Sequence, residues 1–164
     1  MIQPGAPVRA RMGNQASMPD GPTTGLLIGG RARRQSAALP LCETAEGPRL
    51  VLITSRETRR WVVPKGWIEP REPAHLGAAR EAFEEAGLSG EVERLPIGRY
   101  GYEKKLARGV IAPTEVLVFR FRVTALLEDW PERAERERRL FPPEEAACLV
   151  REPELARLIS GLRR

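Results

Sequence analysis

The stretch GWIEPREPAHLGAAREAFEEAGL, residues 66–88, decides how the rest of the chain is interpreted. Pro73 sits where a helix typically begins, and Gly87 sits where it typically ends. The residues between them have a helical spacing of apolar positions. The pattern therefore predicts one helix over residues 73–86.

The two sides of this helix are expected to differ. At 3.6 residues per turn, Glu81, Glu84 and Glu85 fall within an arc of about 100°. Apolar side chains occupy the opposite side at the spacing of a core-facing stripe. These apolar residues are Leu76, Ala79, Phe83 and Ala86. We expect one face to pack against the core and the other to present three carboxylates.

A cluster of carboxylates on one helix face favours a bound cation. Like charges three and four residues apart repel and weaken a helix, and a cation would relieve that repulsion. Oxygen ligands suit Mg²⁺ or Mn²⁺, and Mg²⁺ commonly binds one or two carboxylates together with substrate phosphates. A solvated acidic face is the commoner meaning of paired glutamates and is the alternative here.

The same stretch resembles the Nudix box, G-x5-E-x7-R-E-U-x-E-E-x-G-U, in which U is aliphatic. Seven chance matches at fixed positions would occur on the order of once in 10⁸ positions. The first aliphatic position holds the small residue Ala82, which affects packing rather than chemistry. The seven matching residues are Gly66, Glu72, Arg80, Glu81, Glu84, Glu85 and Gly87.

This resemblance implies an α/β protein with the Nudix fold, a mixed curved sheet sandwiched between helices (α/β/α). It also implies a Mg²⁺ cofactor, with Mn²⁺ as a possible substitute. Glu84 would act as the general base, with Glu103 as the alternative, while Glu72 and Arg80 would pair and fix the loop against the helix. The metal ligands would be the backbone carbonyl of Lys65 and the carboxylates of Glu81, Glu84 and Glu85.

Composition fits one soluble domain. The chain has 164 residues, of which 41% are hydrophobic and 30% charged. Cys42 and Cys148 have no metal-ligand spacing and indicate no disulfide framework, so a cytoplasmic location is expected. No apolar run approaches the roughly 18 residues of a membrane span. We therefore expect no membrane partner, and the sequence leaves the oligomeric state open.

The formal net charge of +5 suits an anionic partner. Charge alone does not separate nucleic acid from a small phosphorylated molecule. No appended DNA-binding segment is visible, so a small polyphosphorylated substrate is expected and nucleic acid is not.

The chain divides into two parts. Residues 1–32 are rich in Gly and Pro without sustained periodicity, which predicts a disordered N-terminal tail. Residues 33–164 are predicted to form the Nudix domain. Its expected strands are 36–42, 49–54, 61–64, 91–95, 97–102 and 115–126, with a loop over 103–113 and helices over 143–150 and 153–162.

The segments flanking the box include the runs LITSR (52–56) and RWVVPKG (60–66) and the phrase EDW (128–130). They resemble the diphosphoinositol polyphosphate phosphohydrolases, a branch that also accepts diadenosine polyphosphates. The dinucleoside polyphosphate hydrolases tend to carry a tyrosine near Tyr100 and Tyr102, and either ring could stack on a base. Guanidinium and ammonium groups near the box suit phosphate oxygens. The expected substrate contacts are Arg34, Thr54, Ser55, Arg56, Lys65, Lys104 and Arg136.

The expected function is metal-dependent hydrolysis of a phosphoanhydride bond in a polyphosphorylated substrate. That substrate would be a diphosphoinositol polyphosphate or a dinucleoside polyphosphate. One alternative is a nucleoside triphosphate pyrophosphohydrolase that cleans the nucleotide pool. The other is a non-catalytic Nudix module that senses a nucleotide.

Overall fold

The computed structural model describes residues 33–163, so the tail predicted over residues 1–32 lies outside the described part of the chain. The elements in chain order are β1 (Arg33–Thr44), β2 (Gly47–Thr54), β3 (Trp61–Val62), β4 (Lys65–Trp67), α1 (Ala74–Ala86), β5 (Leu88–Val92), β6 (Gly98–Lys105), η1 (Ala107–Gly109), β7 (Ile111–Leu126), β8 (Arg138–Phe141), α2 (Pro143–Leu149), α3 (Pro153–Ser160) and η2 (Gly161–Arg163).

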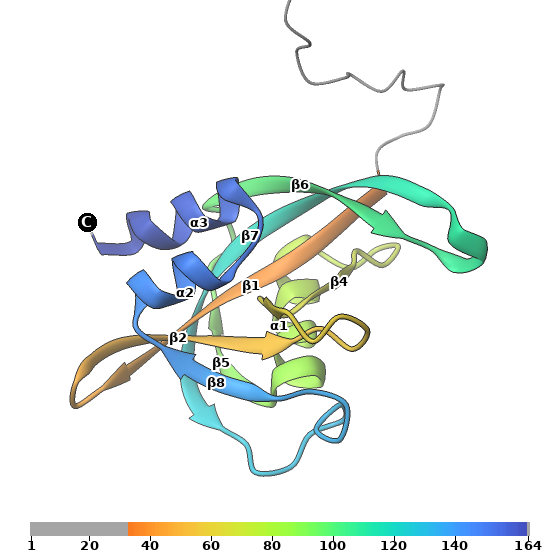
Figure 1. The fold of residues 1–164 in the computed structure, drawn as a ribbon. Helices are drawn as coiled ribbons and strands as arrows, with labels where there is room; N and C mark the ends of the chain where they lie inside the picture. Colours follow the sequence, from red (N-terminus) through yellow and green to blue (C-terminus); the bar gives the residue numbers. More distant parts are fainter. Residues whose placement is uncertain (1–32, 164) are drawn as a thin grey trace, which may run out of the picture. The chain divides into compact units, whose positions relative to one another are not determined.

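The sheet is organised around β1 and β7, its two longest strands. They run parallel, with Arg33 opposite Thr114 and Leu41 opposite Arg122. β2 lies antiparallel on the other side of β1, while β5 and β6 lie antiparallel along successive parts of β7. Residues 33–163 thus form one mixed sheet of eight strands (Figure 1). The long buried strand predicted at 115–126 is confirmed as part of β7.

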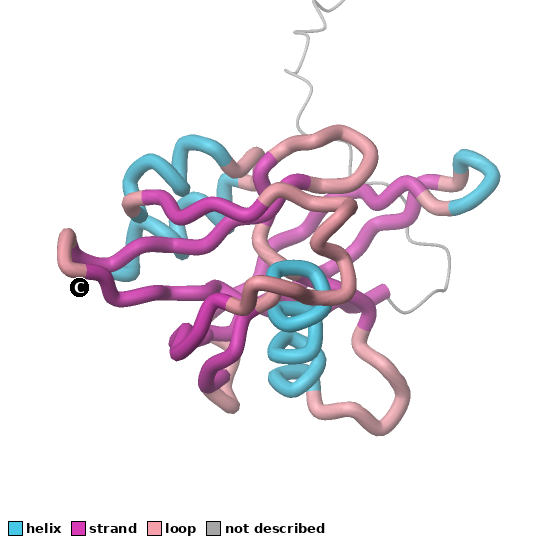
Figure 2. The backbone as a smooth tube through the Cα atoms, turned by 90° about the horizontal axis from the view of Figure 1, so that it is seen from below, coloured by secondary structure: helices cyan, strands magenta, loops and turns pink. Residues whose placement is uncertain are grey.

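Different helices cover the two faces of the sheet, as Figures 1 and 2 show. Side chains alternate between the faces along a strand. In β2, Leu50 and Leu52 belong to the core beneath α2 and α3. Val51 and Ile53 belong to the core beneath α1. The predicted α/β/α arrangement is therefore confirmed.

The apolar face predicted for α1 is confirmed at Ala86 and Ala79, which pack in the core beneath the helix, but not at its two large residues. Leu76 and Phe83 are 49% and 45% exposed. The fully buried side chains are those of Ala78, Ala82 and Ala86, which pack against the sheet. Small side chains let the helix lie close to the strands. The prediction that Leu76 and Phe83 face the core is wrong, because spacing identifies an apolar stripe without choosing between neighbouring stripes.

Two of the three helix carboxylates lie on the packed side of α1. Glu81 and Glu85 are each only 8% exposed, whereas the Glu84 side chain is 39% exposed. Glu81 and Glu85 are three residues after Ala78 and Ala82 respectively, so they share the buried stripe. The predicted separation of an acidic face from a packing face is therefore wrong. The carboxylates instead form part of the margin of the core.

Several strand boundaries also differ from the prediction. The short strands β4 and β8 were not expected, and both depend on pairing with distant strands. β4 pairs with β1, and β8 pairs with β2. β6 and β7 extend into the segment 103–113 that was expected to be a loop. A hairpin with a short turn at η1 therefore projects from the sheet at this point (Figure 1).

None of the helices in residues 33–163 combines the length and apolarity needed to cross a bilayer. Cys42 and Cys148 are both free thiols. The cytoplasmic location stays a prediction.

The C-terminal end of α1 is held by the segment 127–138. Gly87 ends the helix with a left-handed φ of 60°, a conformation that glycine adopts without steric cost. A Cβ at this position would lie 2.6 Å from Cδ2 of Trp130. The N–H of Leu127 donates to the Gly87 carbonyl at 2.9 Å, and the N–H of Glu132 donates to the Glu84 carbonyl at 3.0 Å.

Arg138 supplies a cation to the same helix end. Its guanidinium donates to the carbonyls of Ala86 at 2.9 Å and Leu127 at 3.0 Å. It also lies 4.2 Å from the centre of the Trp130 ring. The last carbonyls of a helix carry partial negative charge, so Arg138 stabilises the helix that positions the carboxylates.

Replacing Arg138 with Met should lower the free energy of unfolding by about 1–3 kcal/mol, because three carbonyl groups, those of Ala86, Gly87 and Leu127, lose a charged donor. Arg139→Met is the matched control, since that neighbouring side chain is 63% exposed and should change stability by no more than about 0.5 kcal/mol. Chemical denaturation of both variants measures the difference. Equal midpoints would show that Arg138 does not hold the helix end.

Candidate functional site

The start of β4 lies directly against the two buried carboxylates of α1. A Cβ at Gly66 would lie only 2.0 Å from Oε1 of Glu81, so only glycine leaves room for this carboxylate. The backbone N–H of Lys65 donates to Oε2 of Glu85 at 2.9 Å. The conformation of residues 65–66 is thus tied to the positions of both carboxylates.

Arg80 links the loop before α1 to the helix carboxylates. Its Nε and Nη2 donate to the two carboxylate oxygens of Glu72 at 3.1 and 3.2 Å, which is the predicted pair in a bidentate arrangement. Its Nη1 donates to Glu81 at 2.7 Å and to Glu84 at 3.2 Å. One guanidinium therefore donates hydrogen bonds to three carboxylates, and a fourth, that of Glu69, lies 3.7 Å from its Nη2.

Arg136 neutralises the remaining buried carboxylate, that of Glu85. The Arg136 side chain is only 6% exposed, and its Nη2 forms a very short contact with Glu85. Its Nε donates to Glu132 at 2.6 Å, and its Nη1 donates to the Thr54 carbonyl at 3.2 Å. Arg136 was expected to contact substrate, but all three of its nitrogens already bind acceptors in the protein.

Burial makes the two inner carboxylates hard to ionise. Burial, reinforced by the charge of Glu85, raises the pKa of Glu81 to about 7. Burial also raises the pKa of Glu85, although the Arg136 and Lys65 charges oppose the shift. Both groups therefore favour an added positive charge, either a proton or a cation.

The oxygen donors of this cluster fit a hard divalent cation. Within residues 33–163, no three acidic, histidine or cysteine side chains already converge as a complete metal cage. Mg²⁺ does not require such a cage, since it keeps several waters and uses one or two carboxylates with substrate phosphates. Glu81 and Glu85 beside the Lys65–Gly66 backbone provide this smaller donor set.

A pocket of about 320 Å³ opens beside the carboxylates. Its walls come from the loop after β2, the start of β4, the hairpin strand β6, and Glu85 and Arg136. The lining residues are Ser55, Arg56, Glu57, Thr58, Arg60, Lys65, Glu85, Tyr102, Glu103, Lys104, Lys105 and Arg136.

The three arginines of this pocket form ion pairs with acidic side chains. Arg136 pairs with Glu85 and Glu132, as described above. Arg56 pairs with Glu135 at 3.2 Å, and Arg60 pairs with Glu152 at 2.8 Å. These arginines therefore fix the pocket walls, and each carries a charge that the protein already balances in part.

Two lysines of the pocket differ from these arginines. The Nζ of Lys65 lies 5.8 Å from the Tyr102 ring centre, and that of Lys104 lies 4.9 Å from the Trp67 ring centre. No hydrogen bond or ion pair to either ammonium occurs among the side chains of residues 33–162. Burial lowers the pKa of Lys65 to about 8 and lowers that of Lys104 as well. These ammonium groups, with that of Lys105, which also lines the pocket, are the lysine cations available to an anionic ligand.

The pocket brings together five of the seven expected substrate contacts: Ser55, Arg56, Lys65, Lys104 and Arg136. Thr54 is 3% exposed, and its hydroxyl accepts a hydrogen bond from the Glu137 N–H at 2.9 Å. Arg34 stands outside the pocket, where its 60% exposed side chain lies 3.8 Å from Glu115. Burial and the hydrogen bond give Thr54 a structural role, and substrate contact by Arg34 stays a prediction.

Sequence reasoning missed three residues that shape the site: Gln35, Glu132 and Glu152. Glu132 and Glu152 lie far along the chain from the site segments, so no local spacing links them to Arg136 and Arg60. Gln35 accepts a hydrogen bond from the Tyr102 hydroxyl at 2.6 Å. Its only sequence signal was an amide at the start of an otherwise apolar strand.

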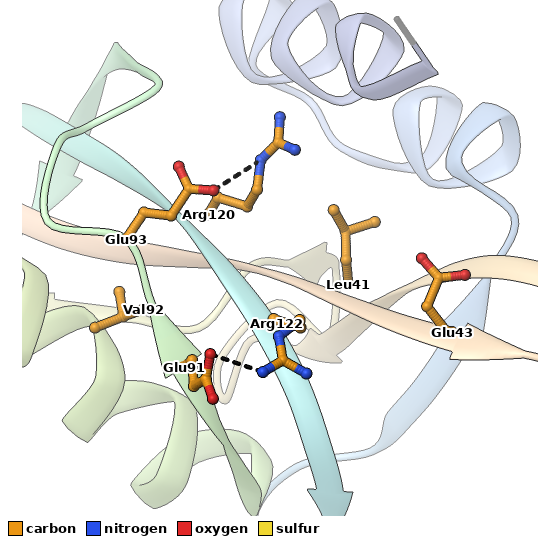
Figure 3. A pocket seen from close by; sticks show the side chains of 7 residues that line it. All are labelled: Leu41, Glu43, Glu91, Val92, Glu93, Arg120 and Arg122. Carbon is orange, nitrogen blue, oxygen red and sulfur yellow. Dashed lines mark ion pairs between the residues drawn. The ribbon is translucent and has the colours of Figure 1, made fainter.

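A second hollow of about 370 Å³ is lined by side chains of β1, β7 and the segment 91–93 (Figure 3). Its two arginines come from β7, where they alternate with Phe119 and Phe121 of the core beneath α1. They therefore face the opposite side of the sheet. Arg122 contacts Glu91 at 2.7 Å, and Arg120 contacts Glu93 at 3.6 Å, so the charges of this hollow largely balance one another.

Comparison with known proteins identifies the family. Residues 32–161 match the family model described as the NUDIX domain. Among solved structures, the C. elegans Ap4A hydrolase matches with a TM-score of 0.57 at 15% identity, over 79% of this chain and 95% of that one. The E. coli dihydroneopterin triphosphate pyrophosphohydrolase matches with a TM-score of 0.61 at 14% identity, over 80% and 96%. At these identities the likeness concerns the fold.

Two similar relatives have higher identity. Nudix hydrolase 12, mitochondrial, from Arabidopsis thaliana is 36% identical over 105 residues, 62% of this chain and 52% of the relative. Diphosphoinositol polyphosphate phosphohydrolase 2 from Rattus norvegicus is 33% identical over 116 residues, 70% of this chain and 60% of the relative. The matched segments thus span little more than half the length of these relatives. Because the family model covers most of the sequence, this chain belongs to the Nudix family.

Proposed function

We propose that this protein hydrolyses a phosphoanhydride bond of a small polyphosphorylated molecule with the help of a divalent cation. The observation that carries the proposal is the meeting of two buried carboxylates, Glu81 and Glu85, with a cation-lined pocket. The carboxylates suit a metal ion, and the pocket suits the phosphates that such an ion would hold.

The metal would be held by the carboxylates of Glu81, Glu84 and Glu85 and by the Lys65 carbonyl. Mg²⁺ or Mn²⁺ at this position would neutralise phosphate charge and lower the pKa of a bound water. Gly66 leaves space for the Glu81 carboxylate, and the Lys65 N–H orients that of Glu85.

Proton transfer from the attacking water is assigned to Glu84. It is the most exposed of the three helix carboxylates and is held by one hydrogen bond from Arg80. The bidentate pair with Glu72 fixes the Arg80 guanidinium. Arg80 therefore positions Glu84 and takes no part in the reaction itself. Glu103, on the pocket wall, is the alternative base.

The substrate is proposed to carry four or more phosphates, as diphosphoinositol polyphosphates and dinucleoside polyphosphates do. Lys65, Lys104 and Lys105 line the pocket beyond the carboxylate cluster, and together with a divalent cation they supply more positive charge than the two negative charges of a diphosphate bridge. The name of the rat relative, a diphosphoinositol polyphosphate phosphohydrolase, supports the same class. Release of inorganic phosphate or pyrophosphate across a substrate panel separates this class from nucleoside triphosphate pyrophosphohydrolysis.

Removal of the metal or of one ligand should abolish turnover. Activity should require Mg²⁺ or Mn²⁺, and Glu85→Gln should lower kcat by about a hundredfold or more while circular dichroism still shows a folded protein. Glu154→Gln, on exposed α3 surface, is the matched control and should retain activity. Full activity in excess EDTA would contradict the metal assignment.

The two candidate bases should respond differently to substitution. Glu84→Gln should lower kcat by about 10²–10⁴-fold, as expected for loss of a general base, whereas Glu103→Gln should leave kcat within a few-fold. Steady-state kinetics at saturating metal provide the comparison. The reverse order of effects would transfer the role to Glu103.

Loss of an unpaired lysine should matter most for long polyphosphates. Lys65→Met and Lys104→Met should each raise KM more for a tetraphosphate substrate than for ADP-ribose, and the wild-type KM should rise with ionic strength while kcat changes less. Arg122→Met, from the second hollow, serves as a charge-matched control with unchanged KM. Equal effects on both substrates would indicate a general nucleoside diphosphate hydrolase.

A further inference from the structure

Gln35 is a buried amide at the centre of the sheet. It is 1% exposed, although it stands in a strand whose inner residues are otherwise mostly apolar. Its backbone is paired with Val116 on one side and with Trp67 on the other, so its position is fixed by two neighbouring strands. The side chain of Gln35 is therefore a rigid attachment point.

Tyr102 connects this attachment point to the pocket. Its hydroxyl donates to Oε1 of Gln35 at 2.6 Å, and the residue lines the pocket wall. Tyr100, on the same strand, lies in the core and is 3% exposed. Of the two tyrosines considered for base stacking, only Tyr102 therefore reaches the pocket. Its ring is held at one end by a buried hydrogen bond.

The face of this ring is already in contact with a cation. The Nζ of Lys65 lies 5.8 Å from the ring centre, within the range of a cation–π interaction. Lys65 pairs with Ala37 in the β1–β4 ladder, and Gln35 pairs with Trp67 two positions away, so Lys65 and Gln35 point to the same face of the sheet. Gln35 thus contacts Tyr102, and Tyr102 contacts the Lys65 ammonium in the pocket.

We propose that Tyr102, anchored by Gln35, is a positioning residue that holds the Lys65 ammonium toward the phosphates of the ligand. Lys65 contacts the anion directly, and Tyr102 acts through it. This inference rests on the proposed function, since it concerns how the same pocket binds a polyphosphate. Because the Lys65 ammonium lies over the face of the Tyr102 ring, that face is unavailable to a nucleotide base.

A double-mutant cycle on binding of inorganic tripolyphosphate tests the inference. Isothermal titration of the metal-free protein gives Kd without requiring turnover. Lys65→Met should raise Kd about tenfold, and Tyr102→Leu should raise it about threefold to tenfold. Tyr102→Phe, which removes only the bond to Gln35, should raise Kd about twofold to fivefold. In the Lys65→Met background, neither Tyr102 substitution should change Kd by more than about twofold.

Tyr100→Phe is the matched control, because it removes a hydroxyl from the same strand outside the pocket and should leave Kd unchanged. Thermal melts verify that each variant is folded. Absence of wild-type binding, an unchanged Kd in Tyr102→Leu, or an equal loss in both backgrounds would overturn the inference. An effect of Tyr102→Leu on adenosine-containing ligands but not on tripolyphosphate would also overturn it, in favour of base stacking.

The two proposals fail in different ways. If the wild-type protein binds tripolyphosphate through Lys65 and Tyr102 but hydrolyses no polyphosphate, the proposed function alone is contradicted. If the wild-type protein hydrolyses polyphosphates but the Lys65 and Tyr102 substitutions change the binding free energy of tripolyphosphate additively, the positioning role alone is contradicted.

Discussion

The charge of two carboxylates, buried on the sheet side of α1, is the constraint on which the site depends. Glu81 and Glu85 occupy positions that an apolar side chain would fill in an ordinary amphipathic helix. A buried carboxylate is costly unless it is paired. Arg80 and Arg136 provide that pairing in the protein itself, and the same requirement makes the cluster suitable for a divalent cation.

Much of the fold could be predicted because its signals are local. The proline at the start of α1, the glycine at its end and the apolar run of β7 each act within a few residues. β4 and β8 could not be predicted, because such short segments become strands only through their partners β1 and β2. The prediction that Leu76 and Phe83 are buried in α1 was wrong, because packing against the sheet decides which stripe of the helix is buried.

The candidate site was predictable to the extent that its residues fall in one motif. The Glu72–Arg80 pair was expected from the resemblance of this stretch to the Nudix box, whereas the placement of Gly66 beside Glu81 is seen only in the structure. The sequence did not show which cations are paired within the protein and which remain free to bind a ligand. Arginine and lysine look alike as charges in the sequence, whereas acidic residues from distant segments occupy Arg56, Arg60 and Arg136 and leave Lys65 and Lys104 to face a ligand.

The attachment of the 127–138 segment to α1 has a consequence for protein synthesis. The helix and its carboxylates leave the ribosome well before Arg136 and Arg138, which neutralise Glu85 and bind the carbonyls at the helix end. A nascent chain that stops before these residues lacks the partner of Glu85, so packing of α1 on the sheet costs more free energy. The pairing of Glu85 is therefore complete only after Arg136, which follows it by 51 positions, has been synthesised.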